Sequence, residues 1–169
     1  LRYCGNRPVI FSSDYENMLS PEELDRAAVH ALEQISGIQS FRLTNRIRTN
    51  AEISSFIQNM MCLPERKKGR HFPHVTVLYA NDDREADVLL SDAQHQGYQV
   101  ILNEAEPVIC ADRLAMVLDQ RYFYDRQNYL RSDDRSVRRL FHQLNGAKEE
   151  LLLVVKQNEP FYTVLLDLL

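Results

Sequence analysis

One segment of the sequence interleaves aromatic and arginine side chains closely enough to form a binding surface. Its members lie between positions 121 and 131: Arg121, Tyr122, Phe123, Tyr124, Arg126, Tyr129 and Arg131. Aromatic rings stack on unpaired bases and arginines attract phosphates, so this mixture is typical of surfaces that bind single-stranded nucleic acid. It is also typical of contact patches between proteins. The sequence leaves both interpretations open, and in the first of them Arg121, Tyr124 and Arg126 are the candidate contacts.

The other residues with chemical potential do not form a catalytic or metal-binding set. His71 and His74 are close in sequence, but a proline between them precludes a regular helix and no cysteine pair or acidic cluster completes a metal site. Glu104 and Glu106 are better explained as surface carboxylates than as an acid–base pair. Cys110 lies in an apolar run with no activating base beside it, which favours a buried, inert thiol over a nucleophile. We therefore expect no metal site and no catalytic residue in this chain on its own.

The composition excludes several classes of protein. The chain has 169 residues, 44% hydrophobic and 26% charged, which suits one domain with a single core, alone or with a short appendage. The longest apolar runs are short, so no membrane-spanning helix and no membrane partner are expected. Three scattered cysteines argue against a disulfide framework and favour a reducing compartment, which predicts a cytoplasmic location. No Gly-rich phosphate-binding string occurs anywhere in the sequence.

Charge is distributed unevenly, although the net formal charge is only −4. Residues 42–70 hold seven Lys or Arg against two acidic residues, and residues 120–148 hold seven against three. Between these basic segments, residues 81–119 hold nine acidic residues against two Arg. The two basic segments are compatible with a positive strip that attracts phosphate, and equally with an ordinary solvated surface.

Hydrophobic periodicity alternates between strands and helices along the chain. It predicts strands at residues 8–12, 38–43, 74–79, 98–102, 113–118 and 151–156. It predicts helices at residues 20–37, 50–61, 82–96, from 133 or 134 through 144 towards 150, and 160–169. A polar hairpin or loop is expected at 120–131. Strands separated by helices of this length predict an α/β fold of three layers, with helices on both faces of a mostly parallel sheet.

Four strings, in this order along the chain, resemble the motifs of one enzyme family. Residues 9–22 (Val-Ile-Phe-Ser-Ser-Asp-Tyr-Glu-Asn-Met-Leu-Ser-Pro-Glu) and 41–53 (Phe-Arg-Leu-Thr-Asn-Arg-Ile-Arg-Thr-Asn-Ala-Glu-Ile) are similar to its third and fourth motifs. Residues 112–125 resemble the strand that follows its fifth motif. Residues 144–155 (Leu-Asn-Gly-Ala-Lys-Glu-Glu-Leu-Leu-Leu-Val-Val) resemble the sixth, Thr-Arg-Ala-Lys-Glu-x-Leu. The family is that of the superfamily-one helicases, the UvrD/PcrA/Rep group, and especially bacterial helicase-like P-loop proteins of unassigned role.

The resemblance implies a three-layer RecA-like domain of the P-loop NTPase type. It places the second, C-terminal RecA-like domain at residues 21–169, and residues 1–20 become the tail of a first such domain or an N-terminal extension. In these motors ATP and Mg²⁺ lie between two RecA-like domains. The first domain holds the phosphates and the metal, and arginines of the second stabilise the charge that develops on the transferred phosphate.

The same resemblance implies roles for individual residues. The set expected at the nucleotide interface and the domain junction is Arg46, Arg48, Asp14 and Asn17. An arginine suits the phosphate because it stays ionised and offers a planar fork of donors. The set expected to bind nucleic acid adds Thr49 and Asn50 to Arg121, Tyr124 and Arg126.

The sequence departs from the family pattern at three places. Asn17 replaces the glutamine of the third motif, residues 108–110 (Val-Ile-Cys) replace the Gly-x-Glu that precedes the fifth, and Gly146 replaces the arginine of the sixth. The phosphate-binding loop and the Mg²⁺-binding motif are expected upstream of Leu1, because the chain lacks an initial methionine and is expected to be a piece of a longer protein. ATP and Mg²⁺ are thus expected in the parent protein but not in this chain, which should not hydrolyse ATP.

Three functional hypotheses follow from these matches and departures. In the first, the chain is the second half of an ATP-dependent DNA or RNA helicase-like protein. It then binds single strands weakly and requires the missing upstream RecA-like domain. In the second, it is a catalytically degenerate helicase-like domain that acts as a nucleic-acid or protein interaction module. In the third, it is an unrelated α/β domain.

The family hypothesis also makes geometric predictions. The strands at 38–43 and 151–155 should belong to one sheet, and the helix start at Asn50 should open onto the same edge as Gly146. Arg48 should be accessible to solvent at that edge. Gly146 should leave a gap there, where an arginine side chain would otherwise project.

Overall fold

The computed structural model describes residues 50–66, 71–102, 107–132 and 136–169, which all belong to one unit of the chain. Five of the site residues named above lie outside this part of the chain: Asp14, Asn17, Arg46, Arg48 and Thr49. The elements expected at 8–12, 20–37 and 38–43 and the domain boundary after residue 20 lie outside it as well.

The core of the described part is a parallel sheet of four strands in the order β1-β6-β3-β2. The strands are β1 (Val75–Ala80), β2 (Gln99–Ile101), β3 (Ala111–Leu118) and β6 (Ala147–Lys156). Strand β6 lies between β1 and β3, and its apolar run Leu151–Val155 is buried on both faces, as a central parallel strand requires. The two positions beside β6 in the sheet are therefore filled by β1 and β3.

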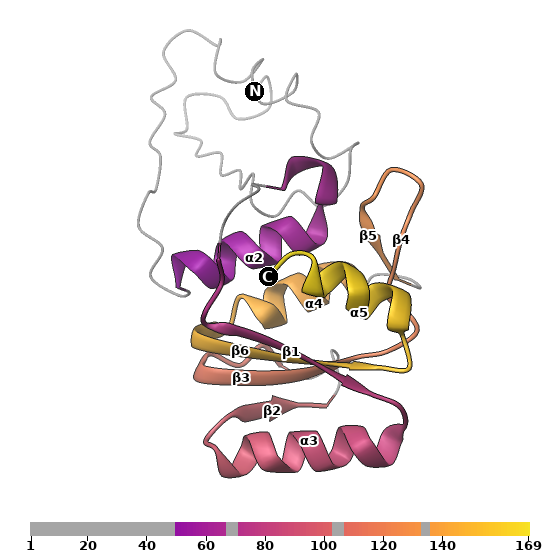
Figure 1. The fold of residues 1–169 in the computed structure, drawn as a ribbon. Coiled ribbons are helices and arrows are strands. Elements are labelled where there is room, and N and C mark those ends of the chain that lie inside the picture. The colour runs from indigo at the N-terminus through magenta and orange to yellow at the C-terminus, as the bar shows by residue number, and fades with distance from the viewer. Residues whose placement is uncertain (1–49, 67–70, 103–106, 133–135) are drawn as a thin grey trace, which may run out of the picture. The chain divides into compact units, whose positions relative to one another are not determined.

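Helices cover both faces of this sheet (Figure 1). Helix α3 (Asp83–His95) lies on one face and packs through Ala86, Leu90 and Ala93 against side chains of β1, β3 and β6. The other face carries α2 (Ala51–Met61), α4 (Ser136–Leu144) and α5 (Glu159–Leu166). The predicted three-layer α/β fold with a mostly parallel sheet is thus confirmed.

Local sequence explains where these helices begin. Helix α2 has the apolar stripe Ile53, Phe56, Ile57, Met60 and Met61, all buried. Its N-cap is Asn50, whose side chain accepts a hydrogen bond from Glu52 N–H. Asp82 caps α3 in the same way, by accepting from Glu85 N–H. Asn158 caps α5, which begins Glu-Pro.

One predicted boundary is wrong. The sequence suggested that the helix containing Leu144 continues towards Glu150, whereas α4 ends at Leu144 and β6 begins at Ala147. The last turn of α4 closes when Asn145 donates its side-chain N–H to Phe141 O and Gly146 donates its backbone N–H to Gln143 O. Strand β6 begins before the predicted residue 151 because its first residues pair with β3. The spacing of apolar residues along a helix carries no information about such pairing.

The segment between β3 and α4 forms a small antiparallel hairpin of β4 (Phe123–Tyr124) and β5 (Leu130–Arg131). It lies on the same side of the sheet as α2, α4 and α5 (Figure 1). A 3₁₀ turn, η2 (Leu63–Glu65), follows α2 and approaches the tip of the hairpin, where Leu63 N–H donates to Asn128 O. None of the helices within the described ranges combines the length and the apolar character needed to span a bilayer.

Candidate functional site

The start of α2 meets the starts of β3 and β6 at one edge of the sheet, here named the amino edge because parallel strands begin there. Asn50 N–H donates to Lys148 O at 3.0 Å, and Ala111 N–H donates to Gly146 O at 3.0 Å. The start of α2 and the chain segments that enter β3 and β6 are therefore adjacent. This edge is opposite the carboxyl ends of the strands, where open α/β sheets usually bind ligands.

Gly146 does not leave the expected gap at the amino edge. A Cβ atom built on Gly146 would lie 2.0 Å from Ile109 O and 2.9 Å from Gln143 O, both backbone atoms. Contacts this short do not occur for real side chains, so the expectation of a gap is wrong. The chain leading into β3 fills the space beside position 146, and with this backbone no arginine side chain can project from it.

Among the residues that the structure describes, charged side chains at the amino edge lie beside groups of opposite charge, and the pair with His74 is ionic only when that histidine is protonated. Three pairs lie there: Lys148 with Asp112 (Nζ–Oδ1 3.3 Å), Arg113 with Glu150 (Nη2–Oε1 3.0 Å) and His74 with Glu52 (Nε2–Oε2 3.7 Å). Lys148 and Asp112 are 48% and 67% exposed. An exposed pair of this kind contributes at most about 1 kcal/mol, so Lys148 can exchange its partner for a phosphate.

Arg113 is held more firmly than Lys148. It donates from Nη1 to Gln96 O at 2.9 Å, and its guanidinium lies over the Tyr98 ring. Tyr98 in turn donates its hydroxyl to Glu150 Oε2 at 2.6 Å. Burial, reinforced by the Glu150 carboxylate, raises the pKa of Tyr98 to about 12. This network ties the end of α3 to β3 and β6.

The hairpin turns most of its aromatic side chains inward. Tyr122 is only 1% exposed and its ring stacks on Phe161 of α5. Tyr124 packs on the same Phe161 with ring centroids 5.5 Å apart, and its hydroxyl donates to Met60 O at 2.9 Å. Burial raises the pKa of Tyr124. The ring of Tyr124, a predicted nucleic-acid contact, is therefore committed to packing on α5.

Phe123 is the aromatic side chain that the hairpin exposes. It is 52% exposed and pairs across the hairpin with Arg131. Strand alternation, with neighbouring side chains on opposite faces, is the signal that could have separated Phe123 from Tyr124 in the sequence. It could not say which of the two faces outward.

Two of the hairpin arginines are paired with acidic neighbours. Arg121 Nε donates to both oxygens of Asp119, at 2.9 and 3.1 Å, and Arg131 Nε donates to Asp125 Oδ2 at 2.7 Å. Partial burial opposes ionisation of Asp119, but the hydrogen bonds and charge of Arg121 outweigh it and lower the pKa of that carboxyl. Arg126, by contrast, is exposed at the turn. Of the predicted contacts that the structure describes, Arg126 is thus placed best for phosphate.

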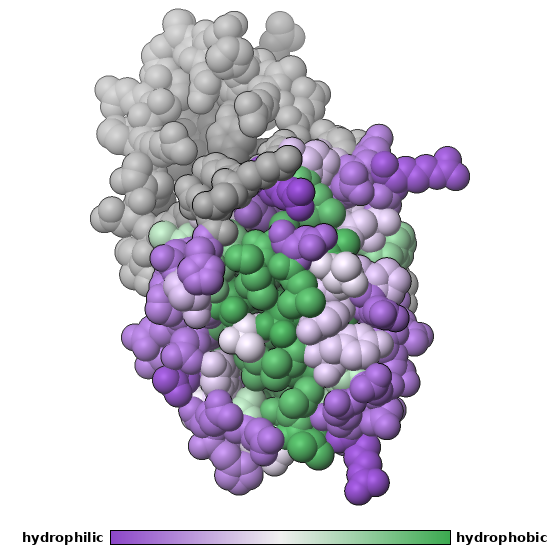
Figure 2. Space-filling model, in the orientation of Figure 1, coloured by the Kyte–Doolittle hydropathy of each residue, from purple (hydrophilic) through white to green (hydrophobic). Residues whose placement is uncertain are grey.

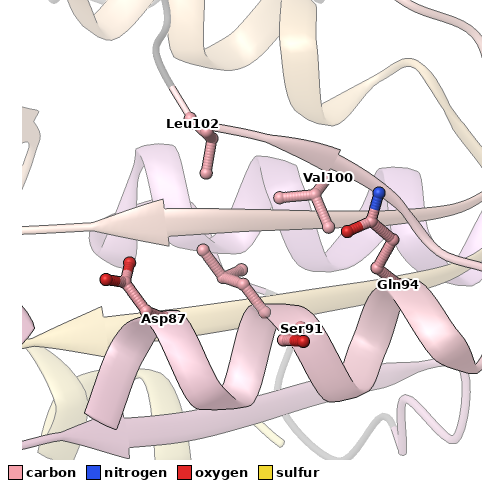
Figure 3. A pocket seen from close by; sticks show the side chains of 6 residues that line it. Asp87, Ser91, Gln94, Val100 and Leu102 are labelled. Atoms are coloured by element: carbon pink, nitrogen blue, oxygen red, sulfur yellow. The ribbon is translucent and has the colours of Figure 1, made fainter. Parts of the chain in front are cut away.

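A shallow hollow of about 270 Å³ lies between α3 and β2, and none of the predicted site residues that the structure describes lines it (Figure 3). Leu90, Val100 and Leu102 supply its apolar part. Its polar part consists of Asp87, Ser91 and Gln94, so its only charge is negative. A hollow of this chemistry does not suit phosphate.

An apolar stripe crosses the face of the molecule seen in Figure 2, from the helix layer above the sheet down to α3. Large apolar side chains are exposed at Val88 of α3 and Leu166 of α5.

In the ranges that the structure describes, no three His, Cys, Asp or Glu side chains gather as a metal site requires.

Comparison of the chain with protein-family models, with curated proteins and with solved structures finds no match.

Proposed function

We infer that this chain is the second RecA-like half of a superfamily-one helicase-like protein, where it forms one wall of an ATP cleft and part of a single-strand groove. The observation that carries the inference is that Asn50, in the string similar to the fourth motif, and residues 146–148, in the string similar to the sixth, meet the entry of β3 at the amino edge. The hydrogen bonds from Asn50 to Lys148 and from Ala111 to Gly146 join them. These regions are far apart in the sequence, and only the fold brings them together. The starts of β3 and β6 lie together because the two strands are parallel neighbours, and the start of α2 beside them is what the fold adds.

The charge that faces the nucleotide is then proposed to come from the residues just before α2. Arg48 precedes Asn50 by two residues in the sequence, and Asn50 lies at the amino edge. Arg48 and Arg46 are proposed to bind phosphate oxygens, because the position that would supply a sixth-motif arginine is closed at Gly146. Lys148 is an exposed cation of the same edge and would assist them.

The chain by itself is expected to show no ATP hydrolysis, with or without single-stranded DNA or RNA. It has no phosphate-binding string in its sequence, and an arginine finger is worth about 10³ to 10⁵ in rate to phosphoryl transfer. Release of inorganic phosphate from Mg²⁺-ATP by the purified chain measures this. Turnover that is stimulated by nucleic acid and persists through stringent purification would contradict the assignment of these motifs.

Single-stranded nucleic acid is expected to bind weakly and with a strong dependence on salt. Each phosphate that the basic segments 42–70 and 120–148 neutralise releases counterions, which steepens the salt dependence. Half a groove should give a dissociation constant on the order of 10⁻⁴ to 10⁻⁶ M. Fluorescence anisotropy of a labelled oligonucleotide at two salt concentrations measures both quantities. Binding that ignores salt, or no binding at low salt, would contradict the nucleic-acid role.

A second candidate function is a catalytically degenerate domain that survives as an interaction module. The closure of position 146 by Ile109 O favours it, because the arginine is excluded by the fold and not only by one substitution. The two candidates differ in what they require of the parent protein. An upstream phosphate-binding loop supports the motor, and its absence supports the module.

A cytoplasmic location is part of both proposals. Cys62 and Cys110 are free thiols, and Cys110 is exposed, so the expectation that it is buried is wrong. Exposed free thiols are typical of proteins kept in a reducing compartment.

A further inference from the structure

The β4–β5 hairpin is fixed at both its base and its tip. At the base, the Asn158 side chain donates to Asp119 O at 3.0 Å and to Tyr122 O at 2.8 Å, which ties the entry of the hairpin to the start of α5. At the tip, Leu63 N–H donates to Asn128 O at 3.1 Å. Next to this hydrogen bond, the backbones of Cys62 and Tyr129 form an isolated antiparallel β-bridge. The hairpin is thus a rigid platform between two helices rather than a free loop.

The turn of the hairpin is organised by one carboxylate. Asp125 Oδ1 accepts from the backbone N–H groups of Gln127 and Tyr129 at 2.9 and 3.0 Å, while Oδ2 accepts from Arg131. Partial burial opposes ionisation of Asp125, but these hydrogen bonds outweigh it and lower the pKa of the carboxyl. Asn128 adopts the left-handed conformation (φ 61°) that asparagine tolerates. Arg126 is left exposed at this turn.

The two faces of the hairpin differ in chemistry. The cross-strand pair Tyr124 and Leu130 faces the helices, and Leu130 is only 1% exposed. The alternate pair, Phe123 and Arg131, lies on the opposite face. Within residues 119–131, all of which the structure describes, Phe123 is the one exposed large apolar side chain.

We propose that Phe123 is the platform on which one base of a single-stranded nucleic acid stacks, with Arg131 beside the base and Arg126 directed to the neighbouring phosphate. This inference rests on the proposed nucleic-acid role and assigns the contact residue within it. A rigid single ring flanked by arginines suits a base, because every base offers a stacking face and carries a phosphate next to it. A protein contact of high affinity instead needs a cluster of exposed apolar anchors that exclude water together. Tyr129 lies on the same face of the hairpin but is partly buried, with Arg131 packed over its ring, so Phe123 is the one exposed large apolar side chain among residues 119–131.

The test compares the full chain with Phe123→Leu and Phe123→Ala by anisotropy, using a labelled oligothymidylate of about 16 nucleotides. Both variants are expected to bind about tenfold more weakly at every salt concentration, with an unchanged salt slope, because stacking is lost and charge is not. Arg126→Gln is expected to lower the salt slope by about 1. Leu102→Ala, which removes an exposed apolar side chain beyond the end of β2, is the matched control and should bind like the parent chain.

Quenching of 2-aminopurine fluorescence distinguishes stacking of a base on Phe123 from contact without stacking. An oligonucleotide with one 2-aminopurine base should lose fluorescence on binding the parent chain, and Phe123→Leu should abolish that quenching. If the parent chain binds with the expected salt dependence but Phe123→Leu binds and quenches equally, the assignment of Phe123 is wrong while the nucleic-acid role stands. If the parent chain binds no oligonucleotide at low salt, the nucleic-acid role itself fails, and Phe123 is left as a contact for a protein.

Discussion

Replacing Gly146 by alanine is expected to lower the free energy of unfolding by about 3 kcal/mol or more. The added Cβ would lie 2.0 Å from Ile109 O, so either the end of α4 or the chain entering β3 must move. Movement of either would strain the hydrogen bond from Ala111 N–H to Gly146 O, which joins the first residue of β3 to the residue just before β6. Thermal unfolding followed by circular dichroism should show a melting temperature about 10 °C lower.

Gly97→Ala is the matched control for this change. Gly97 has a positive φ of 89°, but no atom lies within 4 Å of the position that a Cβ would take, so alanine meets backbone strain without a clash. That strain is expected to cost about 1 kcal/mol. If Gly146→Ala is no more destabilising than Gly97→Ala, the close approach of Ile109 is wrong. Gly146→Arg should be at least as destabilising as Gly146→Ala, which distinguishes a position closed by the fold from an arginine lost by simple substitution.

Replacing Phe161 by alanine is expected to cost about 4 kcal/mol and to weaken oligonucleotide binding as well. Phe161 is 2% exposed, and its ring contacts Tyr122 and Tyr124, so it joins α5 to the inner face of the hairpin. The cavity left by its removal would loosen the platform that carries Phe123. Denaturant titration measures the first effect, and anisotropy under native conditions measures the second.

Leu166→Ala is the control on the same helix. Leu166 is 44% exposed, and its truncation should change the free energy of unfolding by no more than about 0.5 kcal/mol, with oligonucleotide affinity unchanged. A Phe161→Ala variant as stable as Leu166→Ala would contradict the packing of the hairpin on α5. A strongly destabilised Phe161→Ala variant that remains folded and binds the oligonucleotide normally would show that the hairpin is not the platform.

The helices, most of the strands and the class of the described fold could be predicted from residue types and their spacing. The caps at Asn50 and Asp82, the apolar stripe of α2 and the buried run Leu151–Val155 each depend on residues close together in the chain. Capping hydrogen bonds and amphipathic spacing are local, so their residue types reveal them without the fold. The alternation of strands and helices was then enough to predict a parallel sheet covered on both faces.

The sequence could not predict which residues of the amino edge and of the β4–β5 hairpin are available for binding, because their exposure depends on tertiary packing. Tyr124 and Phe123 are equivalent in the sequence, and the position of α5 decides that Tyr124 packs inward. The sequence predicted an empty space at Gly146, where the family has an arginine side chain. The backbone of Ile109 fills that space. Both outcomes depend on contacts between segments far apart in the chain. Neither leaves a local pattern, because burial and backbone contact arise only when those segments pack together.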